Sequence, residues 1–214
     1  MLDMVPESHI AARTDWAPDA AIDWLLSEGR FNDSIRDVFD GYMKRLSDCG
    51  MPVERAALIV RTLHPLIRGW GLRWNRETGT GVEASFYHAT SKAPAYIESP
   101  IHAIHENPVR IRRHIAAADT DFDFPVLQDL KEQGFTDYVA DPLLFSDGSA
   151  SVVTFASRQP GGLGEDDLAK IDRLSRVFAP VIEAITASTA LVASTFEPAS
   201  WLATASISSP LFMA

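Results

Sequence analysis

The sequence has little cysteine, no excess of positive charge and no long apolar run. Its single cysteine, Cys49, excludes an internal disulfide framework and a zinc site built from cysteines. The formal net charge of −10 argues against a general nucleic-acid binder, which would carry a basic face. No run approaches the roughly 18 apolar residues of a membrane helix, and the N-terminus lacks the pattern of a signal peptide. We therefore expect a cytoplasmic protein with no membrane or nucleic-acid partner.

Motifs for catalysis are also missing. The sequence contains no Gly-x-Ser-x-Gly motif, no phosphate-binding loop and no paired acidic motif. Cys49 follows an expected helix and has no obvious histidine partner that would activate it as a nucleophile. We therefore expect no catalytic residue and no cofactor.

The clearest pattern lies in residues 135–185, which predict a strand, a tight turn, a strand, a glycine-rich loop and a long helix. Strand-prone residues fill 138–145 and 150–155. Asp147-Gly148 between them is a hairpin signal, because both residues tolerate the positive φ of a type I′ turn. Pro142 is expected at a bulge or with its nitrogen side unpaired. The helix is expected to open at Gly164 with acidic residues in its first turn, and to kink at Pro180.

The rest of the chain predicts further helices and strands. Apolar periodicity predicts helices over 20–27 and 33–48, and strands are expected over 55–62, 69–76 and 82–88. The irregular middle contains a short helix over 101–104, an extended run over 109–115 and a helix over 124–133. This order predicts an α+β fold, with an antiparallel sheet flanked by helices and a long C-terminal helix. A ligand would then lie between the sheet and the irregular middle.

Composition divides the chain into three parts. Residues 1–18 are polar and punctuated by proline, so a flexible segment is expected there, followed by a domain over 19–185. Residues 186–214 contain a single charged residue, Glu197, and are mostly Ala, Ser and Thr. We expect this tail not to continue the preceding helix and to be disordered or poorly structured.

Two groups of residues are candidates for ligand contact. Arg110 and Arg112 alternate with apolar residues, which puts both arginines on the wet face of a strand. They could contact an anion, since arginine binds phosphate bidentately, or they could belong to a solvated edge strand. Trp70, Trp74 and Phe86 could line a pocket, although core packing is the favoured interpretation.

Three weaker patterns have simpler explanations. Asp119, Asp121 and Asp123 alternate as in a calcium loop, but the required glycine and glutamate are missing, so a solvated loop that caps the next helix is favoured. The glycine pair at 79 and 81 precedes a strand-like run, which favours a hairpin turn over a dinucleotide site. His102 and His105 are helix neighbours, yet no third metal ligand of suitable spacing is evident, so no metal site is expected.

Several short motifs together support a family resemblance. They are IDWLL (22–26), RTLHP (61–65), SPI (99–101), FPVL (124–127), TDYVA (136–140), FSDG (145–148) and RQPGG (158–162). In this order they resemble the N-terminal regulatory region of bacterial class III adenylate/guanylate cyclases, over residues 20–185. The resemblance implies a GAF/PAS-like input module with an undefined small-molecule ligand. The cyclase catalytic domain, with its metal-binding aspartates, has no counterpart in this sequence.

The resemblance leads to three functional hypotheses. The first is a non-catalytic sensor domain in cyclic nucleotide signalling, whose 165–185 helix pairs in a homodimer and transmits the state of the domain. The second is a chain with nucleotidyl cyclase activity of its own. The third is a stand-alone small-molecule binding protein that uses the pocket beside the sheet.

Overall fold

The computed structural model describes residues 15–61, 67–87 and 93–195. The helices are α1 (Asp19–Ser27), the 3-10 turn η1 (Gly29–Phe31), α2 (Ile35–Asp48), α3 (Pro94–Ile97), α4 (Pro100–Glu106), α5 (Pro125–Glu132) and α6 (Glu165–Thr195). The strands are β1 (Arg55–Arg61), β2 (Ile67–Asn75), β3 (Gly79–Tyr87), β4 (Ile111–Arg113), β5 (Asp137–Leu144) and β6 (Ala150–Ser157). No helix in these ranges is long and apolar enough to cross a membrane.

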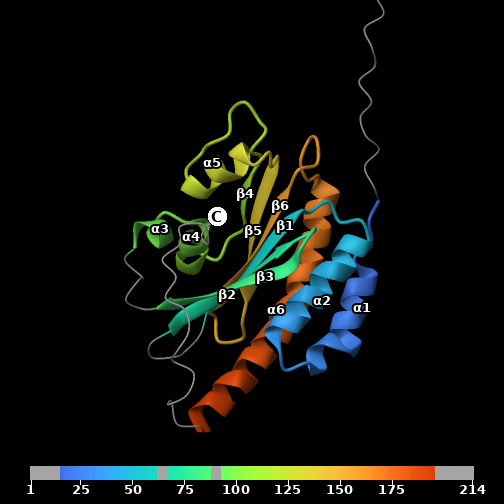
Figure 1. Ribbon diagram of the computed structural model, residues 1–214, viewed down its shortest axis with the longest axis vertical. Helices are drawn as coiled ribbons and strands as arrows, with labels where there is room; N and C mark the ends of the chain where they lie inside the picture. Colours follow the sequence, from blue (N-terminus) through green and yellow to red (C-terminus); the bar gives the residue numbers. More distant parts are fainter. Residues whose placement is uncertain (1–14, 62–66, 88–92, 196–214) are drawn as a thin grey trace, which may run out of the picture.

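The strands form one antiparallel sheet in the order β3-β2-β1-β6-β5-β4 (Figure 1). Its helices lie in two layers. The α1, α2 and α6 helices cover one face, and α3, α4 and α5 cover the other. Each face has its own apolar core, because side chains alternate between the two faces along every strand. The α+β prediction of an antiparallel sheet flanked by helices is therefore confirmed.

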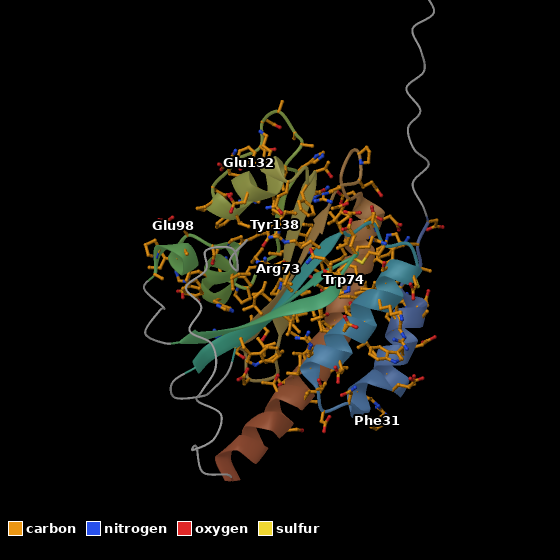
Figure 2. All side chains as sticks on the ribbon, viewed as in Figure 1. Phe31, Arg73, Trp74, Glu98, Glu132 and Tyr138 are labelled. Atoms are coloured by element: carbon orange, nitrogen blue, oxygen red, sulfur yellow. The ribbon has the colours of Figure 1, made fainter. Side chains whose placement is uncertain are left out.

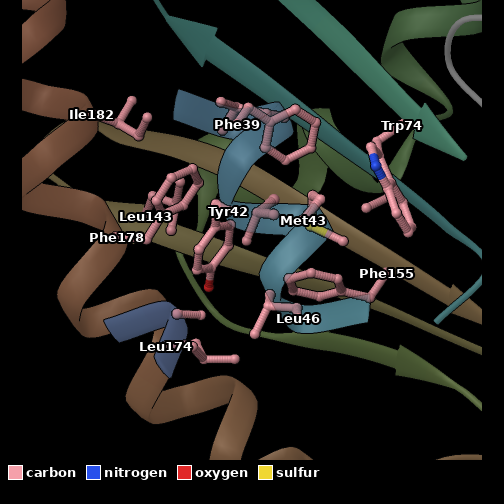
Figure 3. Close-up of a cluster of buried hydrophobic side chains, with 14 of the residues drawn as sticks. Phe39, Tyr42, Met43, Leu46, Trp74, Leu143, Phe155, Leu174, Phe178 and Ile182 are labelled. Carbon is pink, nitrogen blue, oxygen red and sulfur yellow. The ribbon is translucent and has the colours of Figure 1, made fainter. Parts of the chain in front are cut away.

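The larger core lies between the sheet and α2 and α6 (Figure 3). Ser34 caps α2 by accepting from the backbone N–H of Asp37, and the helix then buries every third or fourth residue. On that buried side the ring of Tyr42 stacks on Phe178 of α6, with centroids 4.4 Å apart and planes 10° apart. This contact joins the N-terminal and C-terminal parts of the domain.

Helix α6 begins where the sequence predicts, after Gly164. The carboxylate of Asp167 accepts the Gly164 N–H at 2.7 Å and the indole N–H of Trp16 at 2.8 Å. The prediction that the tail would not continue this helix is wrong for its first ten residues, because α6 runs to Thr195. Residues 186–195 contain no glycine or proline and three alanines, which favours continuation despite the absence of charge. The remaining tail, 196–214, and the segment 1–14 lie outside the described residues.

The predicted hairpin is present, but its turn differs from the expected type. Phe145 accepts the N–H of Gly148 at 3.1 Å and donates its own N–H to Ser149 at 2.9 Å, which leaves three residues in the loop. Gly148 has a φ of 81°. A three-residue loop needs positive φ only at this last position, so the glycine alone meets the requirement. Pro142 lies in β5 beyond Ala140, the last residue paired with β4, as expected for a residue without an N–H.

Two loop predictions are settled by the contacts around them. Gly79 begins β3, and the next N–H, from Thr80, bonds to Asp40 at 2.9 Å, so the glycine pair belongs to a hairpin. The acidic loop with Asp119, Asp121 and Asp123 was expected to cap α5. Instead Phe124 occupies the cap position without a side-chain bond, and Asp123 pairs with Arg113. The charge of Arg113 attracts the carboxylate more strongly than a backbone N–H does.

Candidate functional site

The smaller core, between the sheet and α3–α5, is where the sequence analysis placed a ligand. The sheet contributes mostly small or β-branched side chains there, whereas the helices contribute larger ones. The buried members are Ala57, Ile59, Tyr138, Ala140, Val152 and Ala156 from the sheet, and Tyr96, Ile101, Ile104, Ile115, Val126, Leu127, Leu130 and Phe135 from the covering segments. We call this set the α4–α5 layer.

Strand β2 presents very little side chain to the α4–α5 layer. Trp70, Leu72 and Trp74 pack toward the other core, so Gly69 and Gly71 face this layer by alternation. Both glycines are buried. At Gly69 a Cβ atom would lie 2.5 Å from the carbonyl oxygen of Val60, so the close approach of the two strands requires glycine there. These two glycines therefore contribute no side chains to this part of the sheet face.

Positive charge adjoins these glycines. Arg73 follows them on the same face, opposite Ala57, and Figure 2 shows it on the side of the sheet away from Trp74 and α2. Burial and the neighbouring charge of Arg55 lower the pKa of Arg73 to about 10, which leaves it charged at neutral pH. Burial also lowers the pKa of Arg55, whose Nη1 donates to Gln133 at 3.1 Å, just after α5. Two half-buried cations therefore lie along one side of the layer.

Hydroxyl and imidazole groups complete the polar content. The buried hydroxyl of Tyr138 hydrogen-bonds with Thr154, and burial raises the pKa of Tyr138 well above its ordinary value. In the helices that cover this layer, the hydroxyl of Tyr96 of α3 lies 2.9 Å from Nδ1 of His105 of α4. The ring of Tyr96 is also 5.0 Å from that of His102. Cations, hydroxyls and apolar walls in one layer suit a small ligand held by charge, hydrogen bonds and packing.

Metal binding has no support in this part of the chain. Over the described ranges 15–61, 67–87 and 93–195, no three His, Cys, Asp or Glu side chains are grouped to hold a metal ion. His102 instead lies 4.0 Å from Glu106 on the same helix, and His105 contacts Tyr96.

The structure divides the predicted site residues between the two faces. Trp74 is 3% exposed and packs with Phe39 and Met43, and Trp70 packs against the same core (Figure 3). These positions favour the core-packing alternative for both tryptophans. Phe86 lies in β3 opposite Gly69, and its side chain is outside the described residues. The alternation of aromatic residues with glycine along β2 predicted that the aromatic side chains share one face of the strand. It did not predict which of the two cores that face meets.

Arg110 and Arg112 do belong to an edge strand region, but they are not on a wet face. Their side chains are 26% and 29% exposed and form ion pairs with Asp141 and Asp137 of β5. Hydrogen bonding to Asp137 raises the pKa of the Arg112 guanidinium. The expected solvation fails because Arg110 bonds to Leu168 of α6 and Arg112 bonds to Leu163, just before that helix.

Sequence reasoning missed both aspartates. Asp137 is fully buried and Asp141 nearly so, and a spacing of four along a strand puts both on one face. The spacing of the two aspartates and of the two arginines could have predicted ion pairs between the strands. That prediction also requires β4 and β5 to be neighbours in the sheet, which the sequence does not reveal.

Several solved structures similar to this one are GAF domains. One belongs to a two-component sensor histidine kinase from Bacillus halodurans, with a TM-score of 0.54, 14% identity and coverage of 74% of this chain and 99% of that chain. The phycocyanobilin-bound GAF domain of a cyanobacterial phytochrome gives a TM-score of 0.55, 13% identity and coverage of 80% and 97%. The GAF domain of an Acinetobacter phosphoenolpyruvate-protein phosphotransferase gives a TM-score of 0.52 and 12% identity, with coverage of 83% of this chain and 97% of that chain.

At these identities the similarity establishes the fold. The six-stranded antiparallel sheet with helices on both faces is a GAF-like fold, as the sequence predicted. No protein-family model matches the sequence, and no curated protein does.

Proposed function

We propose that this chain is a non-catalytic signal-input domain of the cytoplasm that binds a small molecule in the α4–α5 layer. One observation carries the proposal: the GAF-like sheet has two separate cores, and they differ in kind. The core under α2 and α6 is large and filled with aromatic rings. The α4–α5 layer combines short covering helices, two buried glycines of β2 and the charge of Arg73. The first is suited to holding the fold together and the second to holding a ligand.

Ligand binding is tested by thermal unfolding of the purified chain against a panel of metabolites. A ligand at a hundred times its Kd adds about 2.7 kcal/mol, which for a domain of this size corresponds to a rise in Tm of roughly 5–10 °C. Arg73→Gln removes the charge next to the glycines, and the ligand-induced rise should shrink. Lys44→Gln, an exposed change on α2, is the matched control and should leave the rise intact. A rise that is the same in both variants would place the ligand elsewhere.

The output is proposed to pass through α6 in a homodimer. Ala169, Arg173, Arg176, Pro180, Ala184 and Ala187 are exposed and recur every three or four residues, so they form one stripe along the helix. From Pro180 to Ala187 the stripe has only small side chains, which would let two helices approach closely there. Figure 1 shows that the end of α6 extends past the sheet, which supports a role outside the domain.

Light scattering tests this dimer. A dimer is expected for the native chain and a monomer for Ala184→Glu, which adds a charge among the small residues of the stripe. Ala118→Glu makes the same change at an exposed loop position on the other side of the sheet and should remain dimeric. A strictly monomeric native chain would contradict helix pairing.

The finer proposal is that the domain regulates a class III nucleotidyl cyclase. The support is the series of short motifs between residues 22 and 162, which includes RQPGG in the loop before α6. The purified chain should form no cyclic nucleotide from ATP or GTP with manganese. Measurable turnover would instead favour the hypothesis of a catalytic chain. Ligand binding without any change in dimerisation would favour a stand-alone binding protein.

A further inference from the structure

Arginines at the edge of the sheet hold the first turns of α6. The Nε of Arg110 lies 2.6 Å from Oδ1 of Asp141, and its Nη2 lies 3.1 Å from Oδ2, so the pair is bidentate. The same guanidinium donates to the carbonyl oxygen of Leu168 at 3.3 Å and lies 3.7 Å from the carboxylate of Asp172. Arg110 therefore joins β5 to the first two turns of α6.

Arg112 makes a second connection of the same kind. Its Nη2 lies 2.9 Å from Oδ2 of Asp137 and also donates to the carbonyl oxygen of Leu163. Its Nη1 lies 3.5 Å from Glu165, the first residue of α6. Asp137 in turn accepts the N–H of Leu163 at 2.9 Å, so this carboxylate is bonded to the loop that leads into the helix. We call the two arginines and two aspartates the charge ladder.

The ladder starts from the least anchored strand of the sheet. Strand β4 has only three residues, pairs with β5 alone and lies at the edge. It is preceded by α4 and followed by α5, two of the helices that cover the proposed ligand layer. The connection from α4 to β4 is short, residues 107–110, whereas the longer segment 114–124 leads from β4 to α5. The side chains of Arg110 and Arg112 cross to the opposite face, where they contact α6.

We propose that the charge ladder is the mechanical link between the α4–α5 layer and α6. Movement of α4 or α5 shifts β4, and the two arginines carry that shift to Leu163, Glu165 and Leu168 at the start of the helix. The inference rests on the proposed function, since it assumes that occupancy of the layer moves its covering helices. The link itself is a property of the free chain and can be measured without a ligand.

Hydrogen exchange of the free chain tests the link. Arg110→Met leaves Asp141 buried without its cation, which costs enough to raise local opening about tenfold or more. Amides of β4 and of the first two turns of α6 should therefore exchange faster together, while those of α2 do not change. Arg113→Met is the matched control: it removes the neighbouring ion pair with Asp123, which does not reach α6. It should speed exchange around β4 only.

The transmission of movement from the α4–α5 layer to α6 is tested by a substitution inside that layer. Ile104 is fully buried in α4, so Ile104→Ala opens a cavity on the far side of the sheet from α6. Faster exchange of the first turns of α6 is expected in the native background, measured relative to α2. In the background Arg110→Met with Arg112→Met, the same cavity should have no further effect on α6. Arg110→Lys with Arg112→Lys provides a milder background if the double methionine variant does not fold.

The outcomes separate the two proposals. An Ile104→Ala effect on α6 of equal size with and without the arginines would overturn the ladder, and so would no effect in either background. Absence of ligand binding or of a dimer would count against the proposed function, and neither result enters the exchange measurement.

Discussion

The loop before α6 offers a sharp test, because two adjacent glycines there have the same backbone conformation and different surroundings. Gly161 has a φ of 79° and Gly162 a φ of 71°. A Cβ at Gly161 would meet nothing within 4 Å. A Cβ at Gly162 would lie 2.5 Å from Oδ2 of Asp137 and 3.1 Å from Nε2 of His114. Alanine at the two positions therefore shares the backbone strain and differs only in the collision.

The expected magnitudes follow from these contacts. Left-handed backbone costs an alanine roughly 1–2 kcal/mol, so Gly161→Ala should lower the free energy of unfolding by that amount. At Gly162 the carboxylate of Asp137 must also move, which weakens its bonds to Arg112 and to the Leu163 N–H. Hydrogen bonds to a charged group are worth about 1.5–3 kcal/mol. Gly162→Ala should thus cost about 3–5 kcal/mol.

Urea unfolding followed by tryptophan fluorescence measures both variants. The difference between them, about 2 kcal/mol, corresponds to roughly 4–8 °C in Tm for a domain of this size. Unchanged slopes in urea would indicate that only stability differs. Equal midpoints for the two variants would refute the reasoning, because they would mean that Asp137 is not fixed in its place.

Three further predictions concern the larger core and the loop beside it. Phe178→Ala should cost about 3–5 kcal/mol in urea unfolding, whereas Lys44→Ala, on the exposed face of α2, should stay within about 0.5 kcal/mol. Burial and the charge of Asp141 raise the pKa of Tyr42 above that of an unfolded tyrosine, which is about 10. The contribution of Tyr42 to the free energy of unfolding is therefore complete below about pH 10 and is lost as the pH rises above it. Tyr42→Phe should reduce this loss of stability between pH 9 and 11. Arg76 donates to the carbonyl oxygens of Met51 and Val53, so Arg76→Met should speed amide exchange in residues 47–53.

Local signals were sufficient for most of the fold. The turn before Ser149, the acidic first turn of α6 and the apolar spacing of α2 each act over a few residues, and each element lies where its signal predicts. Helix α6 exceeded its prediction because alanine favours helix regardless of charge, so a change in composition at residue 186 did not mark an end.

The candidate site depended on contacts between distant parts of the chain. Arg112 was correctly assigned to an edge strand region, but its partners are 25 and 53 residues away and are brought to it by the strand order and the crossing of α6. Likewise, the alternation of Trp70 and Trp74 with glycine showed two unlike faces of β2. Which face meets α2 follows only from the assembled sheet, and so the sequence could not decide between a pocket and the core for these aromatic residues, although it favoured the core.

The contacts of α6 change in kind along its length. Its first turns are held by charged groups such as Arg110, Arg112 and Asp167, and its later turns by Phe178, Ile182 and Ile185. Added salt screens the exposed pairs of Arg110 with Asp172 and of Arg112 with Glu165 and leaves apolar contacts intact, whereas cooling weakens apolar contacts. The two ends of this helix therefore respond to different physical conditions, and ionic strength would loosen the end beside the sheet edge first.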